Sequence, residues 1–115
     1  MTSFAIQIDT LKSIPFVRVE GEIDLHTCPQ LHQTLSQAID TGATSIVLDI
    51  SSVGYIDSTG LGVIAHAARR LLDHQGQIRV VTTNPQVLKV FQLSGLTQKN
   101  LTIYSESAAA LEPNA

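Results

Sequence analysis

A short apolar run near the middle of the chain limits the possible folds more than any other segment. Residues 45–50 read SIVLDI, an almost uninterrupted apolar sequence. A strand that is covered on both faces has this composition, whereas a strand with one face in water alternates apolar and polar residues. The run therefore predicts a central strand of an α/β sheet with other elements packed on both of its faces.

The sequence around this run contains strand and helix patterns in alternation. Phe4, Ile6 and Ile8 alternate with polar or small residues, which predicts a half-buried strand, and residues 17–23 show the same alternation. Residues 11–13 between them suggest an antiparallel hairpin. The further expected elements are a helix from a Thr27–Gln30 capping box to Gly42, a helix over 61–72 that ends at Gly76, a strand over 78–81, a helix from Asn84-Pro85 to Gly95, a strand over 101–103 and a small helix over about 105–111.

The expected element order is therefore β-β-α-β-α-β-α-β-α. Right-handed crossovers make the strands from the second onward parallel, and only the first strand runs in the opposite direction. The 115 residues are predicted to form a single α/β domain (1–115), with a mixed, mostly parallel sheet of about four or five strands and about four helices. Its core is expected to span residues 4–111, and residues 112–115 are expected to form a frayed tail.

The loops after the second, third and fourth strands are expected to open on one edge of this sheet, where α/β folds usually place their sites. These loops are residues 24–27, 51–58 and 82–84, and the middle one leads into VGYIDSTGLG at 53–62. Asp57 or Ser58 is suited to cap the following helix. A cap alone does not explain Gly60 and Gly62, which are predicted to keep side chains clear of a closely approaching group.

Two enzymatic interpretations of this stretch fail. The sequence GLGVIA at 60–65 matches a dinucleotide fingerprint, but its glycines come nine or more residues after Ile50 rather than in a tight strand-to-helix turn. A hydrolase motif around Ser58 would need glycine at position 56, where Ile56 stands. His66 lies about 12 Å along the helix from Ser58, too far to act as its base. We therefore expect no enzyme.

The composition excludes several other classes of function. The formal net charge is −3 and only 15% of the residues are charged, so neither nucleic acid nor an anionic membrane is an expected partner. The start of the chain does not resemble a signal peptide, and the single Cys28 cannot form an internal disulfide, so a cytoplasmic protein is expected. His26, Cys28 and His32 match no compact metal site, and we expect no metal and no cofactor.

The remaining interpretation makes Ser58 a substrate. A phosphate adds about −1.5 to −2 charges, and at a helix N-terminus it meets free N–H donors and the positive end of the helix dipole. The fold should therefore tolerate the modification. A partner that buries the neutral hydroxyl would instead have to desolvate a dianion, which costs several kcal/mol. These properties predict a rigid domain with a charge-switched binding edge.

Four segments resemble the anti-sigma factor antagonists, which are small bacterial proteins built on the STAS domain. They are VEGEID at 19–24, IVLDI at 46–50, YIDSTGLG at 55–62 and IRVV at 78–81, and the resemblance covers roughly residues 4–110. It implies that the unmodified protein binds an anti-sigma factor that is also a serine kinase, which frees the sigma factor. Phosphorylation of Ser58 with ATP then dissociates the complex, and a metal-dependent serine phosphatase reverses the change.

The resemblance also assigns roles to individual residues. Ser58 is the implied phosphate acceptor, and Thr59 is the second choice. The implied partner-binding residues are Asp24, Tyr55, Asp57, Ser58, Thr59, Gly60, Leu61 and Gly62. Two other functions stay open, namely a STAS module of another assembly (a stressosome-like scaffold or the cytoplasmic subunit of a lipid transporter) and an unrelated small enzyme. The sequence leaves both monomer and dimer open.

Overall fold

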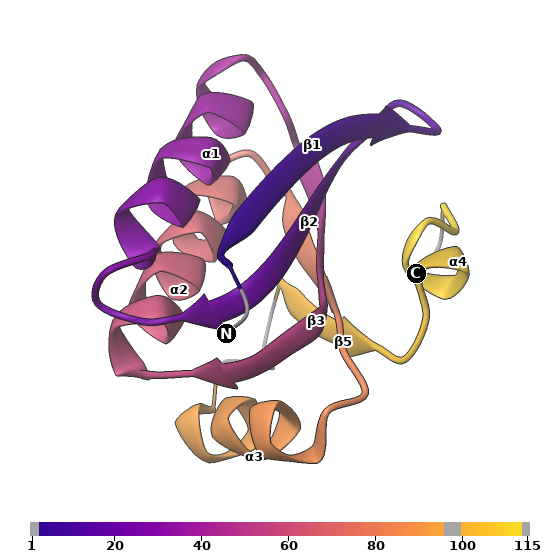
Figure 1. Cartoon of the computed structure of the whole chain (residues 1–115). Helices are drawn as coiled ribbons and strands as arrows, with labels where there is room; N and C mark the ends of the chain where they lie inside the picture. The colour runs from indigo at the N-terminus through magenta and orange to yellow at the C-terminus, as the bar shows by residue number, and fades with distance from the viewer. Residues whose placement is uncertain (1–2, 96–99, 114–115) are drawn as a thin grey trace.

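The computed structural model describes residues 3–95 and 100–113, and in this part of the chain five strands alternate with four helices (Figure 1). The elements are β1 (Ala5–Leu11), β2 (Ile14–Ile23), α1 (Cys28–Asp40), β3 (Ser45–Ile56), α2 (Ser58–Leu72), β4 (Gln77–Val81), α3 (Pro85–Ser94), β5 (Leu101–Tyr104) and α4 (Ser107–Ala110). Both the predicted order and the α/β class are confirmed.

All five strands form one sheet in the order β1-β2-β3-β4-β5. β1 pairs antiparallel with β2, whereas β2 with β3, β3 with β4 and β4 with β5 are parallel pairs. Lys12 and Ser13 connect β1 to β2 and both have positive φ angles, 51° and 66°. A tight hairpin turn of this kind matches the twist of its strands, so the predicted hairpin is confirmed.

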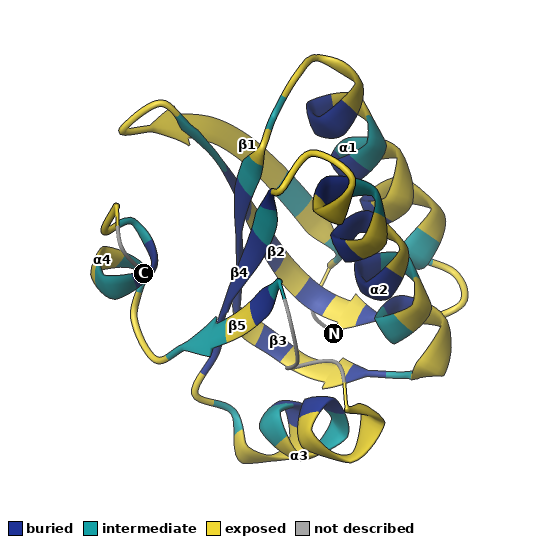
Figure 2. Ribbon diagram, turned by 180° about the vertical axis from the view of Figure 1, so that it is seen from behind, coloured by how far each residue is buried: buried dark blue, intermediate teal, exposed yellow. Residues whose placement is uncertain are grey.

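Two helices cover one face of the sheet. α1 and α2 lie side by side on that face, α3 lies beside the end of β3, and α4 lies on the opposite face (Figure 1). The buried sides of the helices are turned toward the sheet in Figure 2. The largest fully buried side chains are Ile23, Leu31, Leu35, Ile46, Leu48, Ile50, Ile64, Leu71, Ile78 and Phe91. Every residue of 46–50 is buried, as the apolar run predicted.

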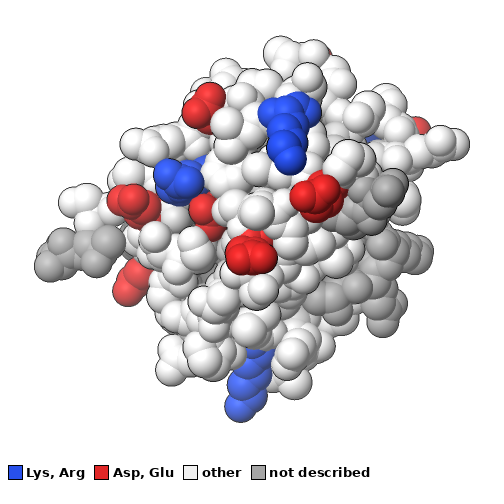
Figure 3. All heavy atoms as spheres, turned by 90° about the vertical axis from the view of Figure 1, so that its right-hand side faces the viewer, with Lys and Arg blue, Asp and Glu red and all other residues white. Residues whose placement is uncertain are grey.

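The opposite face carries a smaller apolar cluster beneath α4. It comprises Phe16, Val47, Val81 and Ala110. Arg79 is buried beside it, and its Nη1 donates hydrogen bonds to the carbonyl oxygens of Ala110 (2.8 Å) and Glu112 (3.0 Å). Carbonyl groups at a helix end lack intrahelical partners, so Arg79 supplies the missing donors and attaches α4 to the sheet. On this side of the molecule, acidic and basic side chains are interspersed (Figure 3).

Three local predictions differ from the structure. β3 does not end at Ile50 but continues to Ile56, because β2 runs beside it as far as Ile23. The Thr27 capping box is wrong, because the Thr27 side chain makes no cap hydrogen bond and instead contacts residues that precede it. β1 is more exposed than a half-buried strand, and Ile8 is 56% exposed.

Two further expectations concern the ends of the chain and membranes. Part of the predicted tail, residues 114–115, lies outside the described residues, while Glu112 is bound through its carbonyl group to Arg79. Within the described segments, no helix is long and apolar enough to cross a membrane.

Candidate functional site

The carboxyl ends of β2 and β3 bring two of the predicted loops together. Ile23 and Ile56 are paired residues at these ends, and the backbone N–H of Asp57 donates to the carbonyl oxygen of Ile23 (3.1 Å). Asp24, which follows Ile23, therefore lies close to Asp57, which starts α2. The third predicted loop follows β4, and there Asn84 caps α3 through hydrogen bonds from the N–H groups of Gln86 and Val87.

Asp57 is the N-cap of α2. Its Oδ1 accepts hydrogen bonds from the backbone N–H of Thr59 (3.0 Å), the backbone N–H of Gly60 (3.1 Å) and the Thr59 hydroxyl. These bonds favour the charged form, so they lower the pKa of Asp57; the largest effect is that of the Thr59 hydroxyl, followed by the Gly60 N–H. Asp57 is thus ionised and held in place by the helix that it caps.

The cap gives the two neighbouring hydroxyl groups different environments. Ser58 is the first residue of α2 and is exposed, and no hydrogen bond of its hydroxyl is present among the described residues. Thr59 is also exposed, but its hydroxyl donates to Asp57. The Ser58 hydroxyl can therefore react without the loss of a hydrogen bond, whereas the Thr59 hydroxyl is engaged with Asp57.

The two glycines of the motif have different roles. A Cβ on Gly60 would lie 2.4 Å from Ile23 Cγ2 and 3.0 Å from Ile56 Cγ1, so Gly60 lets the first turn of α2 pack against the strand ends. It is buried, and its part in partner binding stays a prediction. Gly62 is exposed, and a Cβ there would meet no atom within 4 Å. Of these two glycines, Gly62 is therefore the one that leaves space for a closely approaching group.

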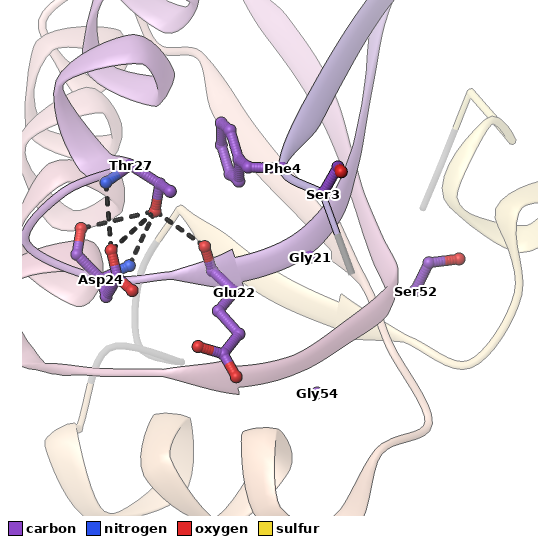
Figure 4. A pocket seen from close by; sticks show the side chains of 8 residues that line it. All are labelled: Ser3, Phe4, Gly21, Glu22, Asp24, Thr27, Ser52 and Gly54. Atoms are coloured by element: carbon purple, nitrogen blue, oxygen red, sulfur yellow. Dashed lines mark hydrogen bonds between the residues drawn. The ribbon is translucent and has the colours of Figure 1, made fainter. Parts of the chain in front are cut away.

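The β2–α1 loop is held by Asp24 and Thr27. Asp24 Oδ1 accepts hydrogen bonds from the N–H groups of His26 (2.9 Å) and Thr27 (3.1 Å), and the Thr27 hydroxyl donates to the carbonyl oxygen of Glu22 (2.7 Å). Figure 4 shows the two side chains pointing toward each other. Residues that line the adjacent open hollow of about 640 Å³ are Ser3, Phe4, Gly21, Glu22, Asp24, Thr27, Ser52 and Gly54.

Exposed apolar side chains flank the start of α2. Tyr55, the penultimate residue of β3, is 50% exposed, and Leu25 in the β2–α1 loop is 65% exposed. Leu61 is half-buried. The sequence interpretation included Tyr55 and Leu61 but missed Leu25, whose signal was an apolar residue inside a polar loop directly after a strand. An acidic edge with an exposed tyrosine suits protein binding, because a few anchor residues, among which Tyr is enriched, supply most of the energy of an interface.

The geometry does not support the dinucleotide-binding or hydrolase interpretations of the motif. α2 follows β3 after the single residue Asp57, so the expectation of a long connection before the glycines was wrong. Even so, β4 ends at Val81 without an acidic residue, which a dinucleotide site of this kind requires. His32 and His66 lie together across α1 and α2, with ring centroids 5.7 Å apart, rather than beside Ser58. The described residues contain no group of three His, Cys, Asp or Glu side chains that could hold a metal ion.

The Asp57 cap leads to a pH-dependent prediction. Asp57→Ala is expected to lower the free energy of unfolding by about 1 kcal/mol at neutral pH, the usual cost of losing an N-cap. Because the folded pKa is lower than the unfolded value, the contribution of the carboxylate is present above about pH 4 and is lost as the pH falls through the folded pKa. Urea unfolding at a series of pH values should show the difference from wild type shrinking below about pH 4.

Asp73→Ala is the matched control, because Asp73 lies at the opposite end of the same helix. A carboxylate at a helix C-terminus is unfavourable, so this change should not reduce stability. A pH-independent loss in Asp57→Ala would show that the hydrogen-bonded carboxylate is not what stabilises the start of α2.

The fold and this edge define a class of single-sheet α/β domains, in which an antiparallel edge strand precedes a parallel series and a capped helix starts at the candidate edge. A family model described as the STAS domain matches residues 5–110, and the chain belongs to this family. The resemblance inferred from the sequence is thereby confirmed.

Relatives and solved structures agree with this assignment. The chain is 31% identical over 107 residues to the anti-sigma F factor antagonist of Paenibacillus polymyxa. This alignment covers 92% of this chain and 91% of that protein. The crystal structure of an anti-sigma factor antagonist from Mycobacterium paratuberculosis has a TM-score of 0.86, with 28% identity over 95% of this chain and 92% of that one. The phosphorylated form of the Bacillus cell fate determinant SpoIIAA has a TM-score of 0.72 and 29% identity, over 92% of this chain and 96% of that one.

Proposed function

We propose that this protein is an anti-sigma factor antagonist whose binding edge is switched by phosphorylation of Ser58. The observation that carries the proposal is the state of the Ser58 hydroxyl, which is exposed on the first residue of α2 while the neighbouring Thr59 hydroxyl is bound to Asp57. The names of the relatives support the first half of the proposal. A structure of SpoIIAA in a phosphorylated form supports the second half.

The partner of the unmodified form is an anti-sigma factor with serine kinase activity. It binds across the adjacent strand ends and the start of α2, through Asp24, Tyr55, Asp57, Ser58, Thr59, Leu61 and Gly62. The acidic groups of Asp24 and Asp57 favour a basic surface on the kinase, and Tyr55 offers an apolar anchor. Gly62 leaves room for the kinase backbone. The protein itself catalyses no step; the kinase transfers the phosphate from ATP, and a metal-dependent serine phosphatase removes it.

The switch acts mainly by repulsion. Asp57 already accepts hydrogen bonds from the backbone N–H groups of Thr59 and Gly60. Few free backbone donors are therefore left at the start of α2 for a phosphate on Ser58. It also adds negative charge beside the ionised Asp57. Phosphorylation therefore changes the surface more than the fold, and a kinase that had buried a neutral hydroxyl would have to desolvate a dianion. A cytoplasmic location fits this role.

Incubation with the cognate kinase and ATP, read by intact mass, tests the proposal. Wild type is expected to gain the mass of one phosphate, Thr59→Ala to gain the same, and Ser58→Ala to gain none. Thr59→Ala is the matched control, since it removes the neighbouring hydroxyl from the same helix turn. Absence of a phosphate on wild type, or an unchanged gain in Ser58→Ala, would remove the proposed function.

A further inference from the structure

The longer edge strand of the sheet is β1. Among the described residues it pairs only with β2, so one row of its backbone N–H and C=O groups has no strand partner there. β5, on the other side, has four residues, and short edge strands resist pairing with other chains. β1 has seven residues, AIQIDTL, without lysine or proline. Asp9 is its single charged residue, so it has few of the features that usually protect an exposed edge.

The side chains of β1 are also unusually apolar for an exposed strand. Ile8 is 56% exposed and Leu11 is 37% exposed. Both line a surface hollow of about 440 Å³, together with Gln7, Asp9, Phe16 and Arg18. An edge strand with free backbone groups and exposed aliphatic side chains is a template for a further strand.

We propose that β1 pairs antiparallel with β1 of a second copy of this chain, about a twofold axis at Ile8. This register matches all seven residues of each strand, since Ala5 lies opposite Leu11, Ile6 opposite Thr10 and Gln7 opposite Asp9. Ile8 then lies opposite Ile8 of the second copy, and the two exposed isoleucine side chains cover each other. The two sheets become one continuous sheet.

Charge complementarity favours this register over its neighbours. An axis at Asp9 would place two carboxylates directly opposite each other, which is destabilising, and an axis at Gln7 would pair only residues 5–9. In the proposed register Asp9 lies opposite Gln7, which itself pairs with Arg18 on β2. Arg18 and Asp9 of the second copy then lie on the same row, about 10 Å apart at the backbone with Gln7 between them. Arg18 is bound to Asp49 through its Nε (3.4 Å), but its side chain is 50% exposed, so its positive charge also faces the acidic Asp9 across the interface.

The proposal goes beyond the phosphorylation switch and is independent of it. Ile8 pairs with Val17, which lies six residues before Ile23 at the end of β2. The twofold axis is therefore about 20 Å from the edge that carries Ser58, and a dimer leaves that edge open. Because the contact is confined to one seven-residue strand from each copy, we expect a weak and reversible dimer.

A disulfide at the axis gives the sharpest test. In a Cys28→Ala background, Ile8→Cys should form a cross-linked dimer on mild oxidation, because directly opposed residues are about 4.5–5.5 Å apart at Cα, within disulfide range. Ile6→Cys is the matched control. Its counterpart on the second copy is four residues away along the strand, about 13 Å, so it should stay monomeric. Equal cross-linking of both variants, or of neither, overturns the proposal.

Sedimentation of the unmodified chain provides a second measurement. Wild type should show a dimer fraction that rises with concentration up to about 0.5 mM, whereas Ile8→Lys should sediment as a monomer because it places two ammonium groups on the axis. Gln33→Lys, on the exposed side of α1, should behave as wild type. A wild type that stays monomeric throughout, or an Ile8→Lys variant that still dimerises, overturns the proposal whether or not Ser58 is phosphorylated.

Discussion

Replacing Ser58 by aspartate is expected to weaken the complex with the kinase by about a hundredfold or more, while leaving the melting temperature nearly unchanged. The loss of affinity follows from burying a new negative charge against a surface that had accommodated a neutral hydroxyl, at a cost of about 3 kcal/mol or more. Stability is retained because Ser58 is exposed and because a carboxylate at the first residue of a helix is favourable, which offsets repulsion by Asp57.

Two variants make this result interpretable. Ser58→Ala should still bind the kinase, since it stays neutral, and Gln37→Glu should also bind, since it adds the same charge on the exposed side of α1 near its far end. Calorimetric titration measures the affinities, and thermal unfolding measures the stability. A Ser58→Asp variant that binds like wild type would contradict the charge switch, and one that unfolds would contradict the rigidity of the domain.

Gly76→Ala is expected to cause the largest loss of stability among single methyl additions in this domain. A Cβ at Gly76 would lie 1.9 Å from the carbonyl oxygen of Thr44, and that oxygen accepts a hydrogen bond from the N–H of Gln77 at the start of β4. Because the obstacle is backbone, the strands must move apart or the hydrogen bond must break. We expect a loss of about 3 kcal/mol or more, and a fall in melting temperature of about 12 °C or more.

Gly62→Ala is the matched control for this change. It adds the same methyl group where no atom lies within 4 Å, inside α2, so it should increase stability by about 0.5–1 kcal/mol. Urea unfolding of both variants measures the contrast. Similar effects from the two substitutions would mean that close packing at Gly76 does not govern its identity.

The features that the sequence predicted are those set by neighbouring residues. The hairpin at Lys12 and Ser13, the cap at Asn84 and the left-handed end of α3 at Gly95 depend on interactions within a few positions. The buried strand at 46–50 was predictable because both faces of the sheet demand apolar residues there. The order of elements followed from these local signals and the handedness of crossovers.

The features that could not be predicted depend on residues far apart in the sequence. Ser51 and Gly54 suggested a loop, but pairing with β2 extends β3 through them. Gly60 was attributed to an approaching partner, whereas Ile23 of β2 is what excludes a side chain there. At Gly76 the nearby residue with positive φ is Gln75, so the glycine serves the contact with Thr44 rather than the turn. None of these contacts leaves a local pattern.

Arg79 binds the last helix through carbonyl oxygens, which every amino acid provides. These hydrogen bonds therefore do not restrict which amino acids occupy the final turn, but they require the chain to extend as far as the carbonyl groups of Ala110 and Glu112. A chain cut before Ala110 would leave a guanidinium group inside the protein without its acceptors. Arg79 on β4 therefore requires a minimum length of the C-terminal segment, whatever its amino acids are.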